Sequence, residues 1–509
     1  MKKILFVLFI AIILILTIKG QLGVPTSTDI NQNEWKENGP FELSPERGRF
    51  ALIYSIVEDK SLIFSIPVAR FVTPDLGYIN GKYVSLFAPA VSFLAIPGYL
   101  VGKYIGISQV GAFATSSLFA LLNVLLIRAI TKKLGASEIS SNISSMLFLF
   151  ASPAFSYSTT LYQHHISTFL ILLSIYSLIV WDNYFSLALI WFLFAASIPV
   201  DYPNIFLMIP IVIYSIRKLF VIKKDENYIS LRINLAKSIG ILSLIIPLLF
   251  FLWFNNASYG NPLQLSGTIK AIKEIDEFGN PALSQLQINT GYNLESVENK
   301  TPLSFFKTRN SLRGLYIHLV SYDRGILIYT PIMIFSFIGV YIFYKKKIEI
   351  LPVLVGVFGF NLLLYSMWGD PWGGWAFGSR YMIPSYAIMT IFIGSVLDNY
   401  KSRSLFILLF LVVAIYSIII NSLGAITTIK IPPKIEVVAL QGVSGRVERY
   451  SYDRNWEFLK ESGSKSFIYK TYLFNKINPF QYYILIVSVL VFVIGGQIIL
   501  LIYKNIRNN

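Results

Sequence analysis

The chain has 509 residues, of which 55% are hydrophobic and 15% aromatic, and it contains no cysteine. Without cysteine there are no disulfides, thiol nucleophiles or cysteine-ligated metals. The formal net charge is +16, but the basic residues form short clusters beside apolar runs and do not interleave with aromatic residues. The charge therefore indicates membrane topology and argues against a nucleic-acid partner.

Apolar runs of roughly 18 to 25 residues recur from end to end, which is the length of helix that crosses a bilayer. We therefore expect an all-α polytopic membrane protein with about 12 transmembrane helices. The predicted spans lie near residues 4–19, 109–131, 139–156, 166–181, 184–198, 202–217, 237–254, 324–344, 348–367, 381–397, 404–424 and 480–503.

Two apolar segments need a separate interpretation. The first, at the N-terminus, resembles a signal peptide, but Thr17, Ile18 and Lys19 stand where cleavage requires small residues, so we predict a retained helix. The second, residues 88–106, is apolar enough to be a thirteenth span. Because crossing there would move most later basic clusters outside, we interpret it as an interfacial helix on the outer surface and keep 13 spans as the alternative.

Lysine and arginine mark cytoplasmic loops, and their clusters place both termini in the cytoplasm. Within the segment 425–478, "KIEVVAL" looks like a strand and "YDRNWEFLKES" like a helix. The predicted organisation is a first transmembrane helix (1–19), a first extracytoplasmic loop with interfacial helices (20–108), a transmembrane core (109–424) with outer loops 256–322 and 368–380, an extracytoplasmic segment (425–478), and a last transmembrane helix with a cytoplasmic tail (479–509).

Charged residues and histidines are scarce inside the predicted spans and gather at their outer ends. Such groups resist burial in hydrocarbon, so their convergence predicts a polar cavity on the outer side of the membrane. The residues concerned are Glu46, Arg47, Arg49, Glu58, Asp59, Asp75, Lys82, His164, His165, Asp201, Asp323, Arg324, Asp370 and Arg380.

These residue types suit one kind of chemistry. A sugar carried on a polyprenyl phosphate presents its anomeric carbon just outside the bilayer. Its transfer needs a carboxylate that accepts the proton of the acceptor and cations that hold the phosphate leaving group. Arginine fits the second role because its guanidinium binds phosphate oxygens in pairs and keeps its charge.

Several short motifs, together covering most of residues 40–400, resemble the GT-C membrane glycosyltransferases, in particular the prokaryotic relatives of protein O-mannosyltransferases and aminoarabinose transferases. The motifs are "SPERGRFALIYSIVEDKSLIFSIP", "PDLGYINGKYVSLFAPAVSFLAIPGYLVG", "YQHHISTF", "DYPN", "NASYGNPL", "SYDRGILIYTP" and "WGGWAFGSRY". The resemblance implies a GT-C-like fold and an inverting hexosyl or pentosyl transferase in the plasma membrane. It would move a sugar from dolichyl or undecaprenyl phosphate to a lipid, glycan or protein acceptor on the extracytoplasmic face.

In that family the catalytic base is an acidic residue soon after the first span, commonly an aspartate three positions before an arginine. The resemblance places Glu46 in this role, three positions before Arg49. Because glutamate replaces aspartate, Asp59 stays a second candidate for the base. An alternative for Glu46 is a helix N-terminal acid, since Ser44 as cap and Pro45 in the first turn make a good helix start.

The remaining outer-face residues are expected to hold the substrates. The two histidines can also bind phosphate, donate a proton or ligate a divalent metal, and the tryptophans also fit an aromatic belt at the membrane interface. Lys82 lies in "DLGYINGKYVS", for which a surface β-turn at Asn80-Gly81 is the alternative. The expected phosphate ligands are Arg49, Lys82, Arg324 and Arg380, and the expected sugar or acceptor ligands are Asp75, Tyr83, His164, His165, Asp201, Asp370, Trp372 and Trp375.

Two other functions remain open. A transporter or lipid flippase usually shows internal repeats and ionisable residues near the bilayer midplane, whereas polarity here is concentrated on one side. A ligase or polymerase of the O-antigen type would use the same lipid carrier but lack the early acidic loop.

Overall fold

The computed structural model describes residues 3–32, 35, 39–224, 229–283, 301–444 and 448–508. In the first half of the chain the helices are α1 (Lys3–Thr17), α2 (Ser27–Ile30), α4 (Ser44–Val57), α5 (Ile66–Val72), α6 (Ala90–Tyr104), α7 (Ser108–Lys133), α8 (Glu138–Phe150), α9 (Ala154–Tyr157), α10 (His164–Val180), α11 (Tyr184–Ser197), α12 (Asn204–Leu207), α13 (Ile209–Arg217), α14 (Leu235–Ser238) and α15 (Ile245–Tyr259).

The second half of the chain contains nine further α-helices among the described residues. They are α17 (Ser311–Leu319), α18 (Ile326–Tyr329), α19 (Ser336–Lys345), α20 (Leu351–Ser366), α21 (Ile383–Tyr400), α22 (Ser404–Ile426), α23 (Lys434–Ser444), α24 (Asp453–Glu461) and α25 (Pro479–Asn508). The strands are β1 (Leu76–Ile79), β2 (Lys82–Ser85), β3 (Phe220–Lys224), β4 (Ile229–Ile233), β5 (Lys270–Ile272), β6 (Glu274–Ile275) and β7 (Pro281–Ala282).

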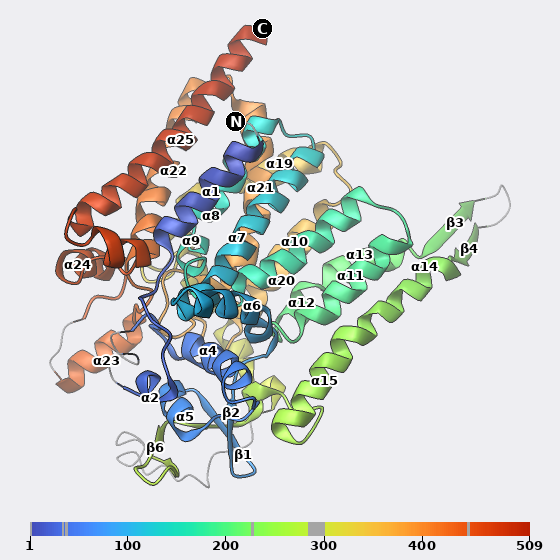
Figure 1. The fold of residues 1–509 in the computed structure, drawn as a ribbon. Helices are drawn as coiled ribbons and strands as arrows, with labels where there is room; N and C mark the ends of the chain where they lie inside the picture. The colour runs from blue at the N-terminus through green and yellow to red at the C-terminus, as the bar shows by residue number, and fades with distance from the viewer. Residues whose placement is uncertain are drawn as a thin grey trace.

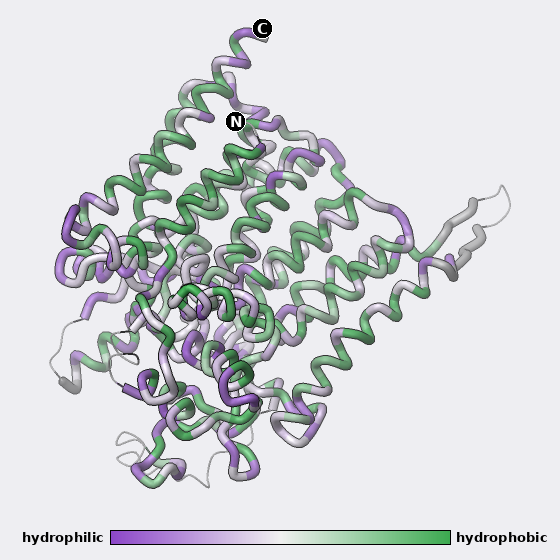
Figure 2. Tube along the Cα trace, in the orientation of Figure 1, coloured by the Kyte–Doolittle hydropathy of each residue, from purple (hydrophilic) through white to green (hydrophobic). Residues whose placement is uncertain are grey.

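The long helices run side by side in a bundle, and both termini lie toward one end of it (Figure 1). The elements of the first loop, including α2, α4, α5, β1 and β2, gather at the opposite end. Hydrophobic residues dominate the bundle, whereas hydrophilic residues concentrate toward its ends (Figure 2). This one-sided gathering of the loop elements positions the candidate site.

Each of the predicted spans overlaps a helix, and among the described residues five helices are long and apolar enough to cross a membrane. The number of crossings stays a prediction, because the other apolar helices have only 10–17 residues. The five long ones are Ser108–Lys133, Ile239–Tyr259, Arg380–Tyr400, Ser404–Ile426 and Pro479–Arg507.

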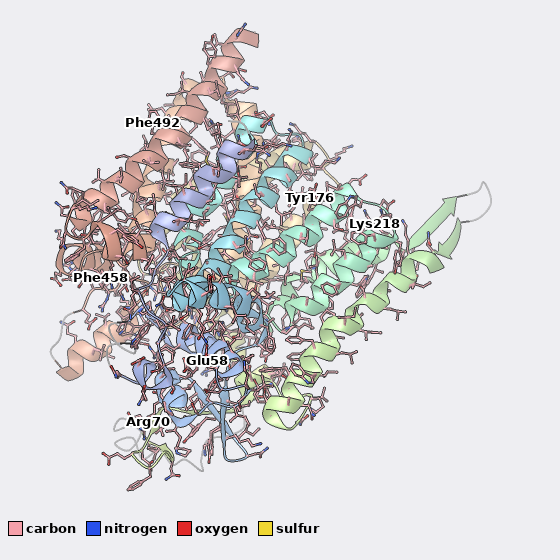
Figure 3. The ribbon with its side chains drawn as sticks, in the orientation of Figure 1. Glu58, Arg70, Tyr176, Lys218, Phe458 and Phe492 are labelled. Atoms are coloured by element: carbon pink, nitrogen blue, oxygen red, sulfur yellow. The ribbon has the colours of Figure 1, made fainter. Side chains whose placement is uncertain are left out.

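Helix α21 lies at the centre of the bundle, where every residue from Ile383 to Leu397 is buried. It packs against α7, α8, α19 and α20. By contrast, α25 lies at the periphery and exposes large apolar side chains such as Phe492, which is 81% exposed (Figure 3). Such a surface suits contact with lipid tails.

The interfacial segment forms α6, a 15-residue helix that contains Pro97 and packs along α7. The two backbones touch at glycines: a Cβ on Gly98 would lie 2.3 Å from the carbonyl oxygen of Gly111. Small residues allow this close approach of neighbouring helices. Helix α6 is not among the described helices that are long and apolar enough to span, and its interfacial position stays a prediction.

The β-turn at Asn80-Gly81 is confirmed. It joins β1 and β2 as a two-residue hairpin loop in which both residues have positive φ, 50° and 75°. Asparagine followed by glycine is the preferred pair for this turn type, because both positions need left-handed backbone. Strand β5 pairs with the other edge of β1, so the later outer loop is held against the first.

The strand expected at "KIEVVAL" is wrong, because these residues belong to helix α23. The carbonyl of Pro433 accepts hydrogen bonds from the amides of Glu436 and Val437, which starts the first turn. A short apolar run has no decisive periodicity, so a strand and a helix segment cannot be told apart from it. The helix expected at "YDRNWEFLKES" is confirmed as α24.

Three distant parts of the chain meet at one buried cluster of charges. The carboxylate of Glu42, just before α4, contacts the Lys19 ammonium at 3.0 Å and the Lys465 ammonium at 2.7 Å. It also accepts a hydrogen bond from the amide of Ile429 at 2.7 Å. Lys19 follows α1, and Lys465 lies between α24 and α25, so Glu42 ties the first helix and the C-terminal segment to the first loop.

We predict that Glu42→Gln destabilises the fold strongly. The amide would leave the fully buried Lys19 ammonium without a countercharge, and breaking a buried pair costs about 3–5 kcal/mol. Thermal unfolding of the purified protein in detergent checks this. Glu58→Gln is the matched control, since its pair with Lys103 is partly exposed and should contribute at most about 1 kcal/mol. Equal losses in the two variants would contradict the prediction.

Candidate functional site

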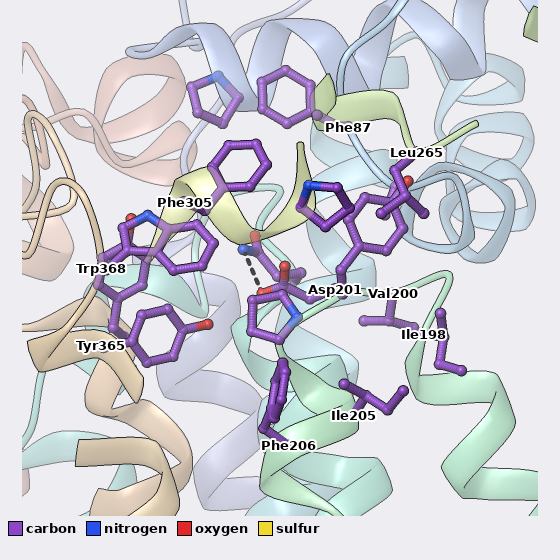
Figure 4. A pocket seen from close by; sticks show the side chains of 18 of the residues that line it. Phe87, Ile198, Val200, Asp201, Ile205, Phe206, Leu265, Phe305, Tyr365 and Trp368 are labelled. Atoms are coloured by element: carbon purple, nitrogen blue, oxygen red, sulfur yellow. Dashed lines mark hydrogen bonds between the residues drawn. The ribbon is translucent and has the colours of Figure 1, made fainter. Parts of the chain in front are cut away.

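A cavity of about 460 Å³ opens where the first loop meets α10, α12, α20 and the start of the α21 segment. Most of its wall is apolar and aromatic, as Figure 4 shows with Phe87, Phe206, Phe305, Tyr365 and Trp368. The lining residues are Pro45, Arg49, Leu86, Phe87, Ala88, Tyr162, Gln163, Ile198, Val200, Asp201, Tyr202, Pro203, Ile205, Phe206, Leu265, Gly267, Pro302, Leu303, Phe305, Phe306, Tyr365, Trp368, Arg380 and Tyr381.

Arg49 enters the cavity from α4, one turn after Glu46. Its Nη1 donates to the carbonyl of Pro45 at 3.0 Å and its Nη2 to Oε1 of Gln163 at 2.6 Å. Its Nε is buried without a hydrogen-bond partner. Burial lowers the pKa of Arg49 to about 10, so the guanidinium remains a cation at neutral pH in a poorly solvated position.

Arg380 enters from the start of the α21 segment. Its Nε and Nη1 are both buried and have no hydrogen-bond partner. Its guanidinium lies over the ring of Tyr162 at 5.3 Å, and the guanidinium of Arg49 lies 5.5 Å from the same ring. The two cations therefore share one aromatic neighbour at the cavity wall, and each has at least one buried nitrogen without a hydrogen-bond partner.

Arg324 has a different role from the one expected. It is fully buried and donates to four backbone carbonyls, those of Asp323, Trp372, Gly374 and Ile431, at 2.7–3.1 Å. It does not line the cavity. Because four of its five N–H groups bond to backbone carbonyls, Arg324 holds the glycine-rich loop, residues 368–380, and does not reach the cavity.

Glu46 is buried at the start of α4. Its Oε2 accepts from the amides of Glu42 at 2.8 Å and Leu43 at 3.1 Å, so it caps the helix as the alternative interpretation proposes. The cap residue is Leu43 rather than Ser44, whose hydroxyl donates to Asp75 at 2.5 Å. The other carboxylate oxygen, Oε1, is buried without a hydrogen-bond partner.

The pKa of Glu46 is raised to about 7, first by burial and then by the nearby Glu42 carboxylate, against the opposing effects of Lys19 and of the two backbone amides. At Glu42 burial also acts upward, but the ammonium groups of Lys19 and Lys465 outweigh it and lower the pKa. The buried cluster thus holds Glu42 ionised and leaves Glu46 poised near neutrality, as a general base requires.

Asp59 lies at the far end of α4 from Glu46. It is exposed, accepts a hydrogen bond from Ser65 at 3.4 Å and does not line the cavity. A carboxylate at this position is about 20 Å from Glu46 along the helix axis, at 1.5 Å per residue. The structure therefore does not bring Asp59 to the arginines.

Asp201 is the acidic residue in the cavity wall. It follows α11 and accepts a hydrogen bond from Nε2 of Gln163 at 3.1 Å, the bond drawn in Figure 4. Since Gln163 also accepts from Arg49, the three side chains form one chain of hydrogen bonds. Burial raises the pKa of Asp201. The hydrogen bond from Gln163 and the positive charges of Arg49 and Arg380 each act in the opposite direction.

The adjacent histidines point in different directions. His164 stacks on Tyr162 with ring centroids 5.7 Å apart, and its Nε2 is buried without a partner. The His165 Nε2 instead bonds to the carbonyl oxygen of Ala154 at 2.7 Å, on the side of α9. Within the described ranges, no group of three or more His, Asp or Glu side chains is arranged to hold a metal ion.

Three first-loop candidates lie outside the cavity wall. Lys82 is exposed beside the hairpin turn. Asp75 accepts from Ser44, and the Tyr83 hydroxyl donates to the carbonyl of Gly279 at 2.8 Å. The Asp75 contact is made within the first loop, and the Tyr83 contact ties this loop to the later loop 256–322.

The middle of the glycine-rich loop also turns away from the cavity. The carboxylate of Asp370 accepts from the amide of Gly374 at 2.5 Å, and Gly373 and Gly374 adopt φ values of 73° and 60° that favour glycine. Trp372 stacks with Arg313, and the Trp375 indole donates to Glu436 at 2.5 Å.

The two ends of the glycine-rich loop reach the cavity, and sequence analysis missed most of these residues. Trp368 stands at one end, while Tyr381 follows Arg380 at the other. Tyr162 and Gln163 were missed too, although they directly precede the histidines in "YQHHISTF". Tyr162, Gln163 and Tyr381 each lie within two positions of a residue that the sequence did predict. The sequence does not show which of these neighbouring side chains faces the cavity, because that depends on the geometry of the turn.

No family model matches the chain, and no curated protein matches it. Among solved structures, the crystal structure of ArnT from Cupriavidus metallidurans in the apo state is 9% identical, with a TM-score of 0.47 over 98% of this chain and 75% of that chain. The crystal structure of the same protein bound to undecaprenyl phosphate is 11% identical, with a TM-score of 0.45 over 99% and 77%. Similarity at this level does not establish a shared fold or activity.

We predict that stability depends on pH through Glu46. The folded state binds this proton more tightly than the unfolded state, whose carboxyl has the ordinary pKa of 4.5. The free energy of unfolding should therefore fall as pH rises from 4.5 to about 7 and then level off. Glu46→Gln keeps an oxygen acceptor for the two amides but cannot bind or release a proton, so it removes this pH-dependent part of the free energy of unfolding. Melting curves of both proteins across this range should diverge with pH; a constant difference would contradict the prediction.

Proposed function

We propose that the chain is a GT-C-type membrane glycosyltransferase that takes a sugar from a polyprenyl phosphate. The donor would be dolichyl or undecaprenyl phosphate carrying a hexose or pentose, and the acceptor a lipid, glycan or protein. The reaction would occur on the extracytoplasmic side of the plasma membrane, with both termini in the cytoplasm.

One observation carries the proposal: Arg49 and Arg380 both line a mostly apolar cavity, and each has at least one buried N–H group without a hydrogen-bond partner. A buried charge without a partner is costly, which points to an anionic ligand that completes the site. The aromatic and aliphatic wall suits the hydrocarbon of the same ligand. A phosphate attached to a polyprenyl chain combines both properties in one molecule.

The proposed mechanism assigns one role to each group. The acceptor hydroxyl attacks the anomeric carbon, the bond from that carbon to the phosphate oxygen breaks, and polyprenyl phosphate leaves with the electron pair. Glu46 takes the hydroxyl proton, while Arg49 and Arg380 stabilise the negative charge that develops on the leaving phosphate. Attack opposite to the leaving group inverts the anomeric centre.

The choice of Glu46 as base rests on its environment. Like Asp59 it is not among the residues that line the cavity, but its Oε1 is buried without a hydrogen-bond partner, its pKa lies near 7, and it stands one turn before Arg49 on α4. Asp201 in the cavity wall is proposed to orient the acceptor through Gln163, and His164 to contact the sugar beside Tyr162.

The binding prediction concerns Arg49 and Arg380, the two arginines in the cavity wall. Arg49→Gln and Arg380→Gln should each weaken binding of undecaprenyl phosphate, measured with radiolabelled lipid and protein in nanodiscs. Loss of charged hydrogen bonds worth about 1.5–3 kcal/mol corresponds to roughly 10- to 100-fold in Kd. Arg403→Gln, an exposed arginine at the other end of α21, is the control. Unchanged affinity in both cavity variants would rule out this phosphate site.

The catalytic prediction separates the three carboxylates. The measurement is the rate at which sugar is released from a radiolabelled polyprenyl-phosphate sugar. Glu46→Gln should lower this rate about 10²- to 10⁴-fold, and the variant protein should still bind the lipid. Asp59→Asn should retain activity, because Asp59 is exposed at the far end of α4. If Glu46→Gln stays active and Asp201→Asn does not, the base is Asp201 and the assignment to Glu46 fails.

A further inference from the structure

A second cavity of about 350 Å³ lies between α17, the tip of the glycine-rich loop and α23. It shares no lining residue with the first cavity. Its wall is formed by Arg313, Tyr316, Ile317, Ser321, Tyr322, Asp323, Trp372, Lys434, Ile435, Val438 and Tyr450.

Four aromatic side chains line this wall, and two of them are well exposed. Tyr316 is 60% exposed and Tyr322 is 42% exposed. Two cations lie against the other rings: the Arg313 guanidinium is 4.7 Å from the Trp372 ring centroid, and the Lys434 ammonium is 5.7 Å from that of Tyr450. The cavity thus combines flat apolar surfaces with charged groups at their edges.

A carboxylate is fixed at the base of this cavity. Asp323 is only 4% exposed, and its Oδ2 accepts a hydrogen bond from the amide of Lys434 at 3.2 Å. The next residue, Arg324, holds the carbonyls of Trp372 and Gly374. The carboxylate and the indole therefore keep a fixed spacing, as a recognition site requires.

This combination matches the chemistry of a saccharide. Sugar rings present apolar C–H faces that pack on aromatic rings. Two neighbouring hydroxyl groups of a sugar can also hydrogen-bond to one charged side chain. A cavity with aromatic platforms and few convergent polar groups is the usual form of a small-molecule site.

The glycine-rich loop connects the two cavities. Its ends, Trp368 and Arg380, line the first cavity, and its tip, Trp372, lines the second. A chain of a few sugar units bound against the tip lies close to the loop that carries the phosphate-binding arginine.

We propose that the second cavity binds an oligosaccharide portion of the acceptor, with Tyr316, Trp372 and Arg313 as its main contacts. The assignment of the bound glycan as acceptor rests on the proposed glycosyltransferase function, whereas glycan binding itself does not.

The test uses the full chain in phosphatidylcholine nanodiscs on a printed array of glycans of two to six sugars. Wild type should give saturable binding to at least one glycan class. Tyr316→Ala and Arg313→Gln should each weaken that binding about tenfold or more, equivalent to about 1.4 kcal/mol. Tyr344→Ala is the matched control, because Tyr344 is a 70% exposed tyrosine on α19 outside both cavities.

Undecaprenyl phosphate binding is measured on the same samples, and Tyr316→Ala and Arg313→Gln should leave it unchanged. Absence of saturable glycan binding by wild type would overturn the proposal, and so would binding that both variants retain. Glycan binding that responds to the variants, in a protein that does not bind the lipid phosphate, would support the saccharide site and reject the glycosyltransferase function.

Discussion

The buried contact of Glu42 with Lys19 and Lys465 is the interaction on which the rest of the site depends. It joins the end of α1 and the first loop, whose residues Lys19 and Glu42 are 23 positions apart, to the C-terminal segment hundreds of residues later. Ion pairs out of water are stable only when each charge is compensated, so the three segments must be assembled together. The first loop is thereby fixed at one end of the bundle, where Arg49 lines the cavity and Glu46 lies buried one turn before it on α4.

The same cluster has an electrostatic consequence for its neighbour. Glu42 is held ionised by two ammonium groups, and its carboxylate then disfavours a second negative charge on Glu46. Two carboxyl groups close in sequence thus acquire opposite behaviour, one as a permanent ion pair and the other as a group that exchanges its proton near neutral pH. The difference comes entirely from which side chains surround them.

The glycine-rich loop is the second organising element. It is held by Arg324, by the Asp370 contact with Gly374, and by the bond from the amide of Ala376 to the carbonyl of Ile431. These contacts turn the middle of the loop away from the first cavity and direct its ends toward it. Arg380 therefore lines the cavity with Nε and Nη1 unpartnered, whereas Arg324 lies outside the cavity wall and bonds to backbone carbonyls through four of its five N–H groups.

Local patterns predicted a large part of the fold. Apolar runs located the helices, because a long helix in lipid must be apolar over most of its length. Asn80-Gly81 identified the hairpin turn, since few residue pairs adopt two positive φ values. The run "KIEVVAL" was misassigned because its β-branched residues suit a strand, while Pro433 and the surrounding chain start a helix.

The sequence by itself determined that the chain is helical and apolar, and that its ionisable residues gather at the ends of the helices rather than within them. It also placed Arg324 and Arg380 in similar positions, each at the start of a helical segment after a polar residue. Only the tertiary structure decided that one binds the backbone and the other faces the cavity. The physical reason is that the role of a guanidinium depends on which acceptors surround it. The carbonyls of Trp372, Gly374 and Ile431, which accept hydrogen bonds from Arg324, come from distant parts of the chain.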